Sequence, residues 1–474
     1  MGPEAYRFVD FLSEAGQSFW QILPVNPSSG LSNSPYQCSS AFAGNPLLIS
    51  PDLLADDGLV EVDEVIGNSG FPRERVGFGT VHSHKRALLS TAHKRFRQKD
   101  RHADYDAFCR VHHHWLNDYV LFMALKSRFH GEPWDRWPEE VRTRRPETLR
   151  SVEAEMSEDL DRERFQQFLF FKQWNALKQY CLQKGVQLIG DIPIYVHYDS
   201  ADVWAHQDIF KLDAHSKPYV VSGVPPDYFS ETGQLWGNPI YRWDILKARG
   251  YDWWLQRLQH NLYLTEVVRL DHFRGLVAYW EVPATETTAK NGTWKKVPVL
   301  DFFRQLLKRF PYLPIIAEDL GTITPDVREV IHRFDLPGMK VLLFAFGDDP
   351  ATNPYVPHNV VRNSVIYTGT HDNNTTRGWF EKEADENMKT RLSAYLGRKV
   401  SVQTVHEELT RLAMMSVANL AIIPMQDVLG LGEASRMNCP AGGSGNWEWR
   451  LLSEQLTEQI ATYLYDMTAT YGRT

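Results

Sequence analysis

Residues 266–273, EVVRLDHF, join a short apolar run to an acidic residue at its end, and this pattern decides the fold. Similar short apolar runs, each closed by a polar or acidic residue, recur six times with helical patterns in between, at residues 19–25, 186–196, 313–321, 340–349, 364–373 and 420–430. Near-continuous apolar strands that alternate with helices are typical of parallel strands buried on both faces. We therefore predict an α/β fold, a (β/α)8 TIM barrel, with a doubly wound sheet as the competing architecture.

Two stretches interrupt this alternation. Residues 51–165 contain no convincing buried strand, so we interpret them as a helical insertion, which leaves residues 1–50 and 166–474 for the catalytic barrel. Residues 197–250 interleave Gly, Pro and aromatic residues; a loop of that length is usually functional or disordered, and its aromatics argue against disorder. We expect one interrupted barrel with a long aromatic substrate loop, although 474 residues would allow about three domains.

The composition argues against several classes of protein. The formal charge is −8, from 51 Lys and Arg against 59 Asp and Glu, whereas sequence-independent nucleic-acid binders need a basic surface. The apolar runs are shorter than the roughly 20 residues of a membrane-spanning helix. Scattered cysteines without a CxxC pair fit a reducing cytoplasm and suggest neither disulfides nor a zinc site: Cys38, Cys109, Cys181 and Cys439.

Acidic residues mark the ends of the predicted strands. Five of them each lie at or just past the carboxyl end of a separate apolar run: Asp191, Asp271, Glu318, Asp372 and Asp427. In a barrel these ends converge on one rim, where active sites are built. The alternative is structural, because such acids also cap helices or pair with arginines such as Arg269, Arg274 and Arg377. The coincidence of all five favours a site.

The surroundings of these acids suggest different chemical roles. Arg269 and Asp271 point to the same side of their strand, and a neighbouring arginine favours an ionised carboxylate, as a nucleophile requires. Glu318 follows the apolar sequence PIIA, which should raise its pKa and make it the proton donor. Asp372 stands beside His371 and Asn373, which suit it to bind sugar hydroxyls. One ionised and one protonated carboxyl group are what cleavage of a glycosidic bond needs.

Aromatic residues in the long loop supply the other half of a sugar site. Apolar sugar faces pack on aromatic rings, and residues 222–244 offer Tyr228, Phe229, Trp236, Tyr241 and Trp243. The alternative is that these rings anchor the loop to the barrel. The consecutive histidines at 112–114 cannot converge on one metal ion from a helix, because successive side chains point about 100° apart.

The chain resembles the amylomaltases, the 4-α-glucanotransferases or disproportionating enzymes of the α-amylase-like clan. The motifs that carry the resemblance run from end to end and include residues 34–49 (SPYQCSSAFAGNPLLI), 223–241 (GVPPDYFSETGQLWGNPIY), 267–276 (VVRLDHFRGL), 369–379 (GTHDNNTTRGW) and 422–441 (IIPMQDVLGLGEASRMNCPA). The resemblance implies a barrel with helical insertions, no metal and no organic cofactor. It also implies α-1,4-glucans as partners: maltodextrins, amylose, glycogen or starch.

The resemblance also implies roles for individual residues. It makes Asp271 the nucleophile, Glu318 the general acid/base and Asp372 the carboxylate that stabilises the transition state. It adds substrate-binding positions at Tyr36, Asp191, Trp236, Arg269, His371 and Asn446. Members of the family carry a first barrel strand ahead of the segment that in this chain begins Met1-Gly2-Pro3, so we expect seven strands and an open edge.

The resulting hypothesis is a 4-α-glucanotransferase that acts by a retaining double displacement. Such a mechanism places the two reacting carboxyl groups about 5–5.5 Å apart. An α-glucan hydrolase would use the same carboxylates, and a glucan-binding protein without turnover is a second alternative. The choice of transfer over hydrolysis rests on the resemblance.

Overall fold

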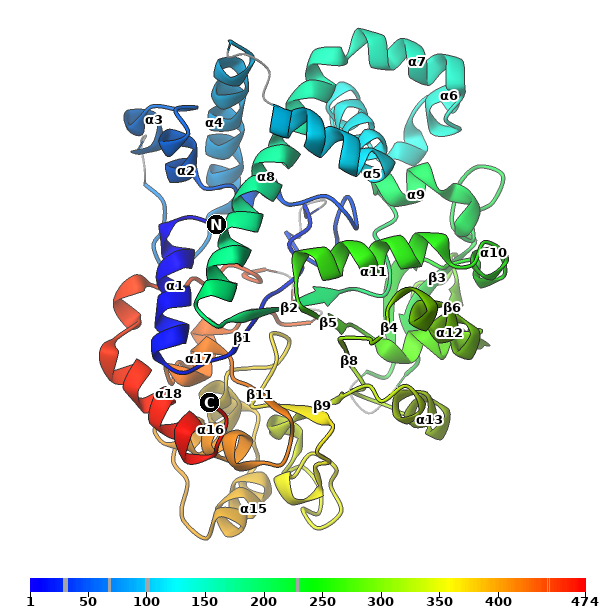
Figure 1. Cartoon of the computed structure of the whole chain (residues 1–474). Helices are drawn as coiled ribbons and strands as arrows, with labels where there is room; N and C mark the ends of the chain where they lie inside the picture. The colour runs from blue at the N-terminus through cyan, green and yellow to red at the C-terminus, as the bar shows by residue number, and fades with distance from the viewer. Residues whose placement is uncertain (29–32, 67–69, 99–102, 227–229, 441, 443) are drawn as a thin grey trace.

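A parallel sheet of seven strands forms the centre of the molecule (Figure 1). The computed structural model describes residues 1–28, 33–66, 70–98, 103–226, 230–440, 442 and 444–474. The strands follow the order β1 (Phe19–Gln21), β2 (Gln187–Ile192), β5 (Val267–Leu270), β8 (Ile315–Ala317), β9 (Gly338–Val341), β10 (Ser364–Tyr367) and β11 (Leu420–Ile422). All six pairings in this order are parallel, so every strand ends at the same rim.

Each strand of this sheet overlaps one of the seven predicted apolar runs, which confirms the barrel-type α/β fold. Burial explains the agreement, since all four residues of β10 are buried and only apolar, β-branched segments fit between two covered faces. The one shift is at β9, which begins at Gly338, while the later part of the predicted run turns into the short 3-10 helix η5 (Leu342–Phe344).

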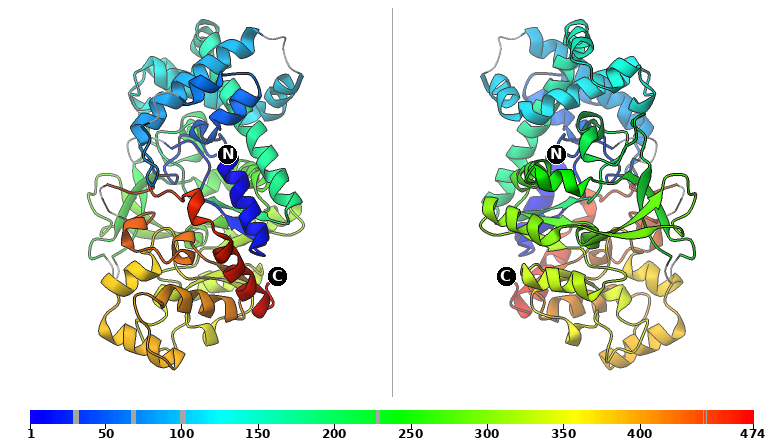
Figure 2. Two further views of the ribbon diagram at one scale, coloured as in Figure 1. Left: turned by 90° about the vertical axis from the view of Figure 1, so that its left-hand side faces the viewer. Right: turned by 90° about the vertical axis from the view of Figure 1, so that its right-hand side faces the viewer.

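Helices follow the strands and surround the sheet. They include α1 (Pro3–Glu14), α11 (Asp252–Leu264), α12 (Val299–Arg309), α13 (Pro325–Arg333), α14 (Thr376–Lys382), α15 (Glu386–Leu396), α16 (Val405–Met415) and α18 (Glu458–Thr470). Helices α1 and α18, from opposite ends of the chain, lie side by side (Figures 1 and 2). Thr324 and Pro325 occupy the N-cap and first position of α13, where the fixed φ and missing N–H group of proline suit the start of a helix. No helix in the described part of the chain is long and apolar enough to span a membrane.

Between β1 and β2 the chain forms a group of helices at one end of the molecule (Figure 2). They are α2 (Pro51–Asp56), α3 (Val62–Ile66), α4 (Phe78–Gln98), α5 (Ala103–Arg128), α6 (Glu139–Arg142), α7 (Pro146–Glu155) and α8 (Ser157–Gln183). The predicted limit at residue 165 falls inside α8, which runs on from these helices to the start of β2. The helical group and the barrel are therefore joined by one continuous helix.

A second, antiparallel sheet takes two of its strands from the long aromatic loop that we predicted for residues 197–250 and two from residues 278–296. Its order is β4 (Gln234–Pro239), β3 (Val220–Val224), β6 (Ala278–Pro283) and β7 (Thr293–Lys296). The sequence prediction missed it because these strands are short and partly exposed: all four residues of β7 are exposed, so no apolar run marks it. This sheet carries part of the aromatic segment as ordered strands.

The two outermost strands of the central sheet, β1 and β11, are not paired with each other among the described residues. A cavity of about 260 Å³ lies between them, lined by residues 19–23 on one side and 421–424 on the other. Inside the barrel, the Tyr367 hydroxyl donates a hydrogen bond of 2.9 Å to Gln21 Oε1 and links β10 to β1. The seven-stranded sheet thus has an open seam, as expected, which side chains partly bridge.

Candidate active site

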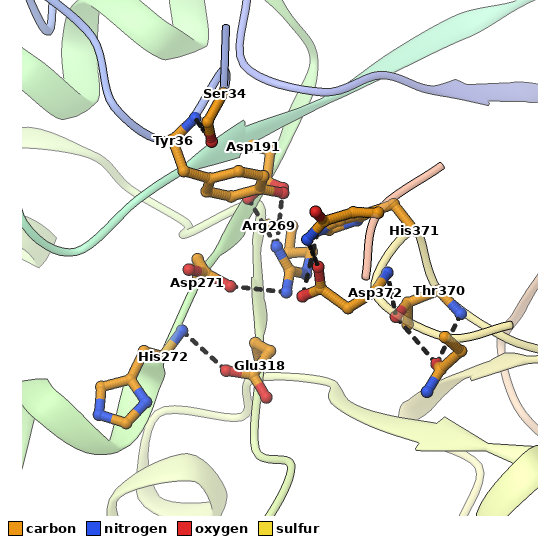
Figure 3. A network of polar contacts seen from close by, with 12 residues as sticks. Ser34, Tyr36, Asp191, Arg269, Asp271, His272, Glu318, Thr370, His371 and Asp372 are labelled. Carbon is orange, nitrogen blue, oxygen red and sulfur yellow. Dashed lines mark hydrogen bonds and ion pairs between the residues drawn. The ribbon is translucent and has the colours of Figure 1, made fainter. Parts of the chain in front are cut away.

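A buried arginine joins two of the predicted carboxylates at the rim (Figure 3). Asp191 on β2 and Arg269 on β5 are register partners, and Asp271 follows the end of β5. Nη1 of Arg269 donates to both oxygens of Asp191, at 2.9 and 2.7 Å, while Nη2 donates to Asp271 Oδ1 at 2.7 Å. The side chains of Arg269 and Asp191 are 4% and 1% exposed, but that of Asp271 is 29% exposed. The buried pair of Arg269 and Asp191 therefore holds the partly exposed Asp271 carboxylate in a fixed position.

Glu318 follows β8 and lies next to this cluster (Figure 3). Its two oxygens accept backbone hydrogen bonds, Oε2 from His272 N at 2.8 Å and Oε1 from Leu320 N at 2.9 Å. Burial and the negative charge of Asp271 raise the pKa of Glu318 to about 7, against the opposing effects of Arg269 and the two N–H groups. The carboxyl group is therefore substantially protonated near neutral pH, as its apolar sequence setting predicts.

Asp372 follows the end of β10 and lies in the same group of residues, beside His371 (Figure 3). Its Oδ1 accepts a 2.6 Å hydrogen bond from Asn438 Nδ2, and His371 Nε2 lies 3.4 Å from its Oδ2. Burial raises the pKa of Asp372, but His371, Asn438 and Arg269 outweigh burial and lower it to about 2. Its side chain is 46% exposed. Asp372 is thus an accessible carboxylate that stays ionised over the whole physiological range.

Aromatic rings cover one side of the carboxylates. The Tyr36 hydroxyl donates to Asp191 Oδ2 at 2.5 Å, and its ring stacks on His371 with centroids 5.2 Å apart. Trp447 completes the group, with its ring 5.8 Å from Tyr36 and 5.9 Å from His371. Trp236 of β4 lies edge-on to the ring of His272. The site therefore combines ionised and protonated carboxyl groups with flat apolar surfaces.

This combination fits acid/base and nucleophilic chemistry on a sugar. A carboxyl group with a pKa of about 7 can give and take a proton at neutral pH, while carboxylates held by Arg269 and by Asn438 remain acceptors or nucleophiles. Within the described residues, no group of three or more His, Cys, Asp or Glu side chains is arranged to hold a metal ion. Glu318 can therefore donate and accept a proton, Asp372 stays ionised, and Arg269 orients Asp271 toward the open side of the site.

Comparison with known proteins decides the family. The model of glycoside hydrolase family 77, described as 4-alpha-glucanotransferase, matches residues 1–456. The chain belongs to the 4-α-glucanotransferase family.

Several 4-α-glucanotransferases are similar over nearly their whole length. The chain is 46% identical to the enzyme of Aquifex aeolicus, covering 100% of this chain and 95% of that one. It is 47% identical to that of Thermus thermophilus, covering 98% and 94%. The solved structure of amylomaltase from Streptococcus agalactiae in complex with acarbose has a TM-score of 0.96 and 38% identity, covering 100% of this chain and 95% of that one.

In this member of the 4-α-glucanotransferase family, most of the predicted site residues lie close together. Asp191, Arg269, Asp271, Glu318, His371, Asp372 and Tyr36 form one connected group, while Trp236 lies beside it through His272. The amide of Asn446 is occupied by its own loop, since it accepts from Cys439 N at 2.9 Å. Tyr228 and Phe229 lie outside the described residues.

Three predictions for the rim are wrong. Asp427 is 1% exposed and points into the protein, where it accepts hydrogen bonds from Thr368 Oγ1 at 2.6 Å and from Thr376 N at 2.8 Å at the start of α14. It is the helix-capping acid that the structural alternative describes. Tyr241 and Trp243 are 0% and 7% exposed and pack against the aromatic residues of α11, so they anchor the segment and do not face a sugar.

The sequence interpretation missed four residues that shape the site. Arg436, Asn438 and Trp447 come from the segment after α17 (Met425–Val428), and they reach Asp372 and His371 from far along the chain. The residues lie inside or beside motifs that carry the family resemblance, but neither periodicity nor charge distinguishes them. His272 gave no signal because its contribution comes from its backbone N–H group.

Proposed function

We propose that Asp271, Glu318 and Asp372 are the catalytic carboxylates with which this member of the 4-α-glucanotransferase family transfers α-1,4-glucan segments. The observation that carries the proposal is the contrast between two neighbouring carboxyl groups. Arg269 holds Asp271 through a 2.7 Å hydrogen bond, whereas burial and Asp271 raise the pKa of Glu318 to about 7. A retaining mechanism needs these two states side by side.

In the first step, Oδ2 of Asp271, the oxygen that does not accept from Arg269 Nη2, attacks the anomeric carbon of the donor glucan. The bond from this carbon to the glycosidic oxygen breaks, and Glu318 gives its proton to that oxygen, so the shortened glucan leaves with a new 4-hydroxyl group. A β-linked glucosyl ester on Asp271 results. The ionised Asp372, with a pKa of about 2, stabilises the positive charge that develops on the sugar ring.

In the second step, the ionised Glu318 accepts the proton of an acceptor's 4-hydroxyl group. The acceptor oxygen attacks the anomeric carbon, the ester bond to Asp271 breaks, and the α-1,4 linkage is restored. Glu318 regains its proton and the cycle closes. A water molecule in the acceptor's place would give hydrolysis, so exclusion of water decides the product.

The substrate-binding roles follow from what surrounds the carboxylates. Asp372 and His371 offer polar atoms to sugar hydroxyls, while Tyr36 and Trp236 offer rings for the apolar sugar faces. Arg269 and Asp191 act beneath them and fix Asp271. The similar amylomaltase of Streptococcus agalactiae was solved in complex with acarbose, which supports a ligand-binding site in this fold. We place the enzyme in the cytoplasm and treat the helices within residues 51–165 as an insertion subdomain of the barrel.

Incubation of the purified protein with maltotriose tests the proposal. Transfer predicts release of glucose together with a ladder of longer maltodextrins, resolved by chromatography. Shortening without elongation would indicate a hydrolase, and unchanged maltotriose with measurable binding would indicate a glucan-binding protein. With α-maltosyl fluoride, which needs no proton on its leaving group, Glu318→Gln should accumulate a glycosyl ester that peptide mass spectrometry locates on Asp271.

A further inference from the structure

The backbone at His272 adopts a conformation that few residues adopt. Its φ and ψ are 50° and 52°, in the left-handed region, directly after the proposed nucleophile Asp271. Histidine reaches this region more readily than most side chains, whereas β-branched residues are strongly disfavoured there. The turn aims the His272 N–H group at Glu318 Oε2, at 2.8 Å, and the next residue's N–H group, that of Phe273, donates to the Glu318 carbonyl oxygen at 3.1 Å. The left-handed conformation of His272 thus directs two backbone N–H groups to Glu318, the proposed acid/base.

The imidazole ring of His272 points away from Glu318 (Figure 3). It lies edge-on to Trp236, with centroids 4.7 Å apart and ring planes at 83°. On another side it packs on Gly275, where an added Cβ would lie only 3.1 Å from His272 Cδ2. Burial lowers the pKa of His272 to about 4, so the ring is neutral at physiological pH. One residue therefore contacts both the acid/base and a ring of the second sheet.

We propose that His272 is a positioning residue that sets the direction of the Glu318 carboxyl group through its backbone and couples it to Trp236 through its ring. The inference rests on the proposed function, because it takes Glu318 as the acid/base and Trp236 as a sugar-stacking ring. Packing of a sugar on Trp236 and alignment of the proton donor are then linked events. Such linkage favours reaction when an acceptor glucan occupies the site.

The groups around Glu318 set the direction of the expected pH effect. The charged and titratable side chains near it are Asp271, Arg269, Asp319, Tyr355 and Tyr367, besides His272 itself. Of these, Asp271 raises the pKa of Glu318 and Arg269 lowers it, while the His272 N–H group also lowers it by hydrogen bonding to the carboxylate. Misdirecting that N–H group should raise the pKa of Glu318 and move the alkaline fall in activity to higher pH.

Two substitutions separate the backbone from the ring. His272→Val strains the left-handed turn, so we expect kcat to fall by about 10- to 100-fold. The alkaline limb of the kcat profile should shift to higher pH by roughly 0.5–1 unit. His272→Gly keeps the turn and its N–H group, so the alkaline limb should stay in place while kcat/KM for a glucose acceptor falls. Because the ring acts through Trp236, the losses in His272→Gly and Trp236→Ala should be non-additive in the double variant.

A matched control comes from a second histidine with a positive φ. His130 has a φ of 52° and lies exposed after α5, so His130→Val and His130→Gly impose the same backbone changes away from the site. They should leave kcat and the pH profile unchanged. Circular dichroism and thermal unfolding check that all variants are folded.

A folded His272→Val with the wild-type kcat and pH profile would overturn the backbone role. If that variant does not fold, His272→Ala makes the same comparison with less strain. A shifted alkaline limb in His272→Gly, or additive losses with Trp236→Ala, would overturn the division of roles. Failure of the proposed function is distinguishable, because wild-type protein would then form no maltodextrin ladder at all.

Discussion

Arg269 fixes Asp271 by a single hydrogen bond from Nη2, while its other terminal nitrogen is fully engaged with a second, buried carboxylate. Only a planar fork with separate donors can hold two carboxylates in this way, and the point charge of a lysine cannot. We therefore expect Arg269→Lys to fold but to lose about 100-fold or more in kcat, because Asp271 is no longer aligned. Steady-state kinetics of maltotriose disproportionation measures this loss.

Arg269→Ala should cost stability as well as activity, since it leaves the 1% exposed Asp191 carboxylate without its ion-pair partner and with only the hydrogen bond from Tyr36. Removing one member of a buried ion pair costs about 3–5 kcal/mol in the free energy of unfolding. Equal stability of the lysine and alanine variants would contradict this account of the cluster.

Asp271→Asn should reduce transfer by about 10³-fold or more, because the amide is a poor nucleophile toward the anomeric carbon. The contacts of Arg269 with Asp191 persist in this variant, so its unfolding transition should stay near that of the wild type. Asp466→Asn, at an exposed position of α18, is the matched control and should be fully active. Activity above a few per cent in Asp271→Asn, free of wild-type contamination, would remove Asp271 from its role.

The pH dependence of activity should report Glu318. The carboxyl group must be protonated to serve as the acid, and its pKa is raised to about 7, so kcat should fall as pH rises through about 7. Asp372 ionises with a pKa of about 2 and therefore contributes no fall between pH 4 and 7. Glu318→Gln, assayed with α-maltosyl fluoride for formation of the ester, should show no alkaline limb near 7. Persistence of that limb would assign it to another group.

Asn438 should control the protonation of Asp372, since it donates a 2.6 Å hydrogen bond to Oδ1. Asn438→Asp places a like charge there, which raises the pKa of Asp372 and should lower kcat most strongly at acidic pH. Asn291→Asp makes the same change beside Glu286 on an exposed turn and should have no effect on activity. The pH profile of kcat distinguishes these outcomes, and a uniform loss at all pH values would argue against the electrostatic reason.

Arg436 should position the same carboxylate through the main chain. It donates to the Asp372 carbonyl oxygen at 2.8 Å through Nη2 and to the Asn438 carbonyl oxygen at 2.7 Å through Nε, which ties the two segments together. In Arg436→Lys a single ammonium group replaces the two donor nitrogens and cannot make both hydrogen bonds. We therefore expect kcat to fall by about tenfold with a smaller change in KM. A change confined to KM would instead make Arg436 a substrate-binding residue.

Asp427 should matter for stability and not for chemistry. Its removal in Asp427→Ala leaves the buried Thr368 hydroxyl and the Thr376 N–H group without their acceptor, at a cost of about 1–3 kcal/mol in the free energy of unfolding. Asp385→Ala removes the exposed N-cap of α15 and should cost about 1 kcal/mol. Denaturant unfolding gives both values, and kcat per folded molecule should be unchanged. A large loss of kcat would return Asp427 to the site.

The central sheet could be predicted from the sequence because burial on both faces leaves a plain signal. All residues of β10 and β8 are buried, and three of the four in β9 are, whereas the two edge strands β1 and β11 are half-buried along their length. The second sheet gave no such signal, since β7 is exposed along its length and half of the residues of β4 are exposed. Where a short strand is exposed to solvent, its sequence lacks an apolar run and cannot be told from that of a loop.

The carboxylates show the same limit at the level of single residues. Asp271 and Asp427 both follow apolar runs, and only the turn after each strand decides whether the side chain faces the rim or the start of a helix. Asn438 and Trp447 depend on a distant segment folding back across the site, which no local pattern records. Sequence motifs identified the chemistry of the site, and the tertiary structure supplied its supporting residues.

The seam between β1 and β11 should make this part of the barrel open locally more easily than the rest. Around most of the sheet, each strand is fixed by main-chain hydrogen bonds on both sides, but within the described part of the chain these two strands have a paired neighbour on one side only. Local unfolding should start there, and amide hydrogens of β1 and β11 should exchange with solvent before those of β5 and β8. Arg269 and His371 line the same cavity, so such opening would reach the proposed catalytic group from beneath.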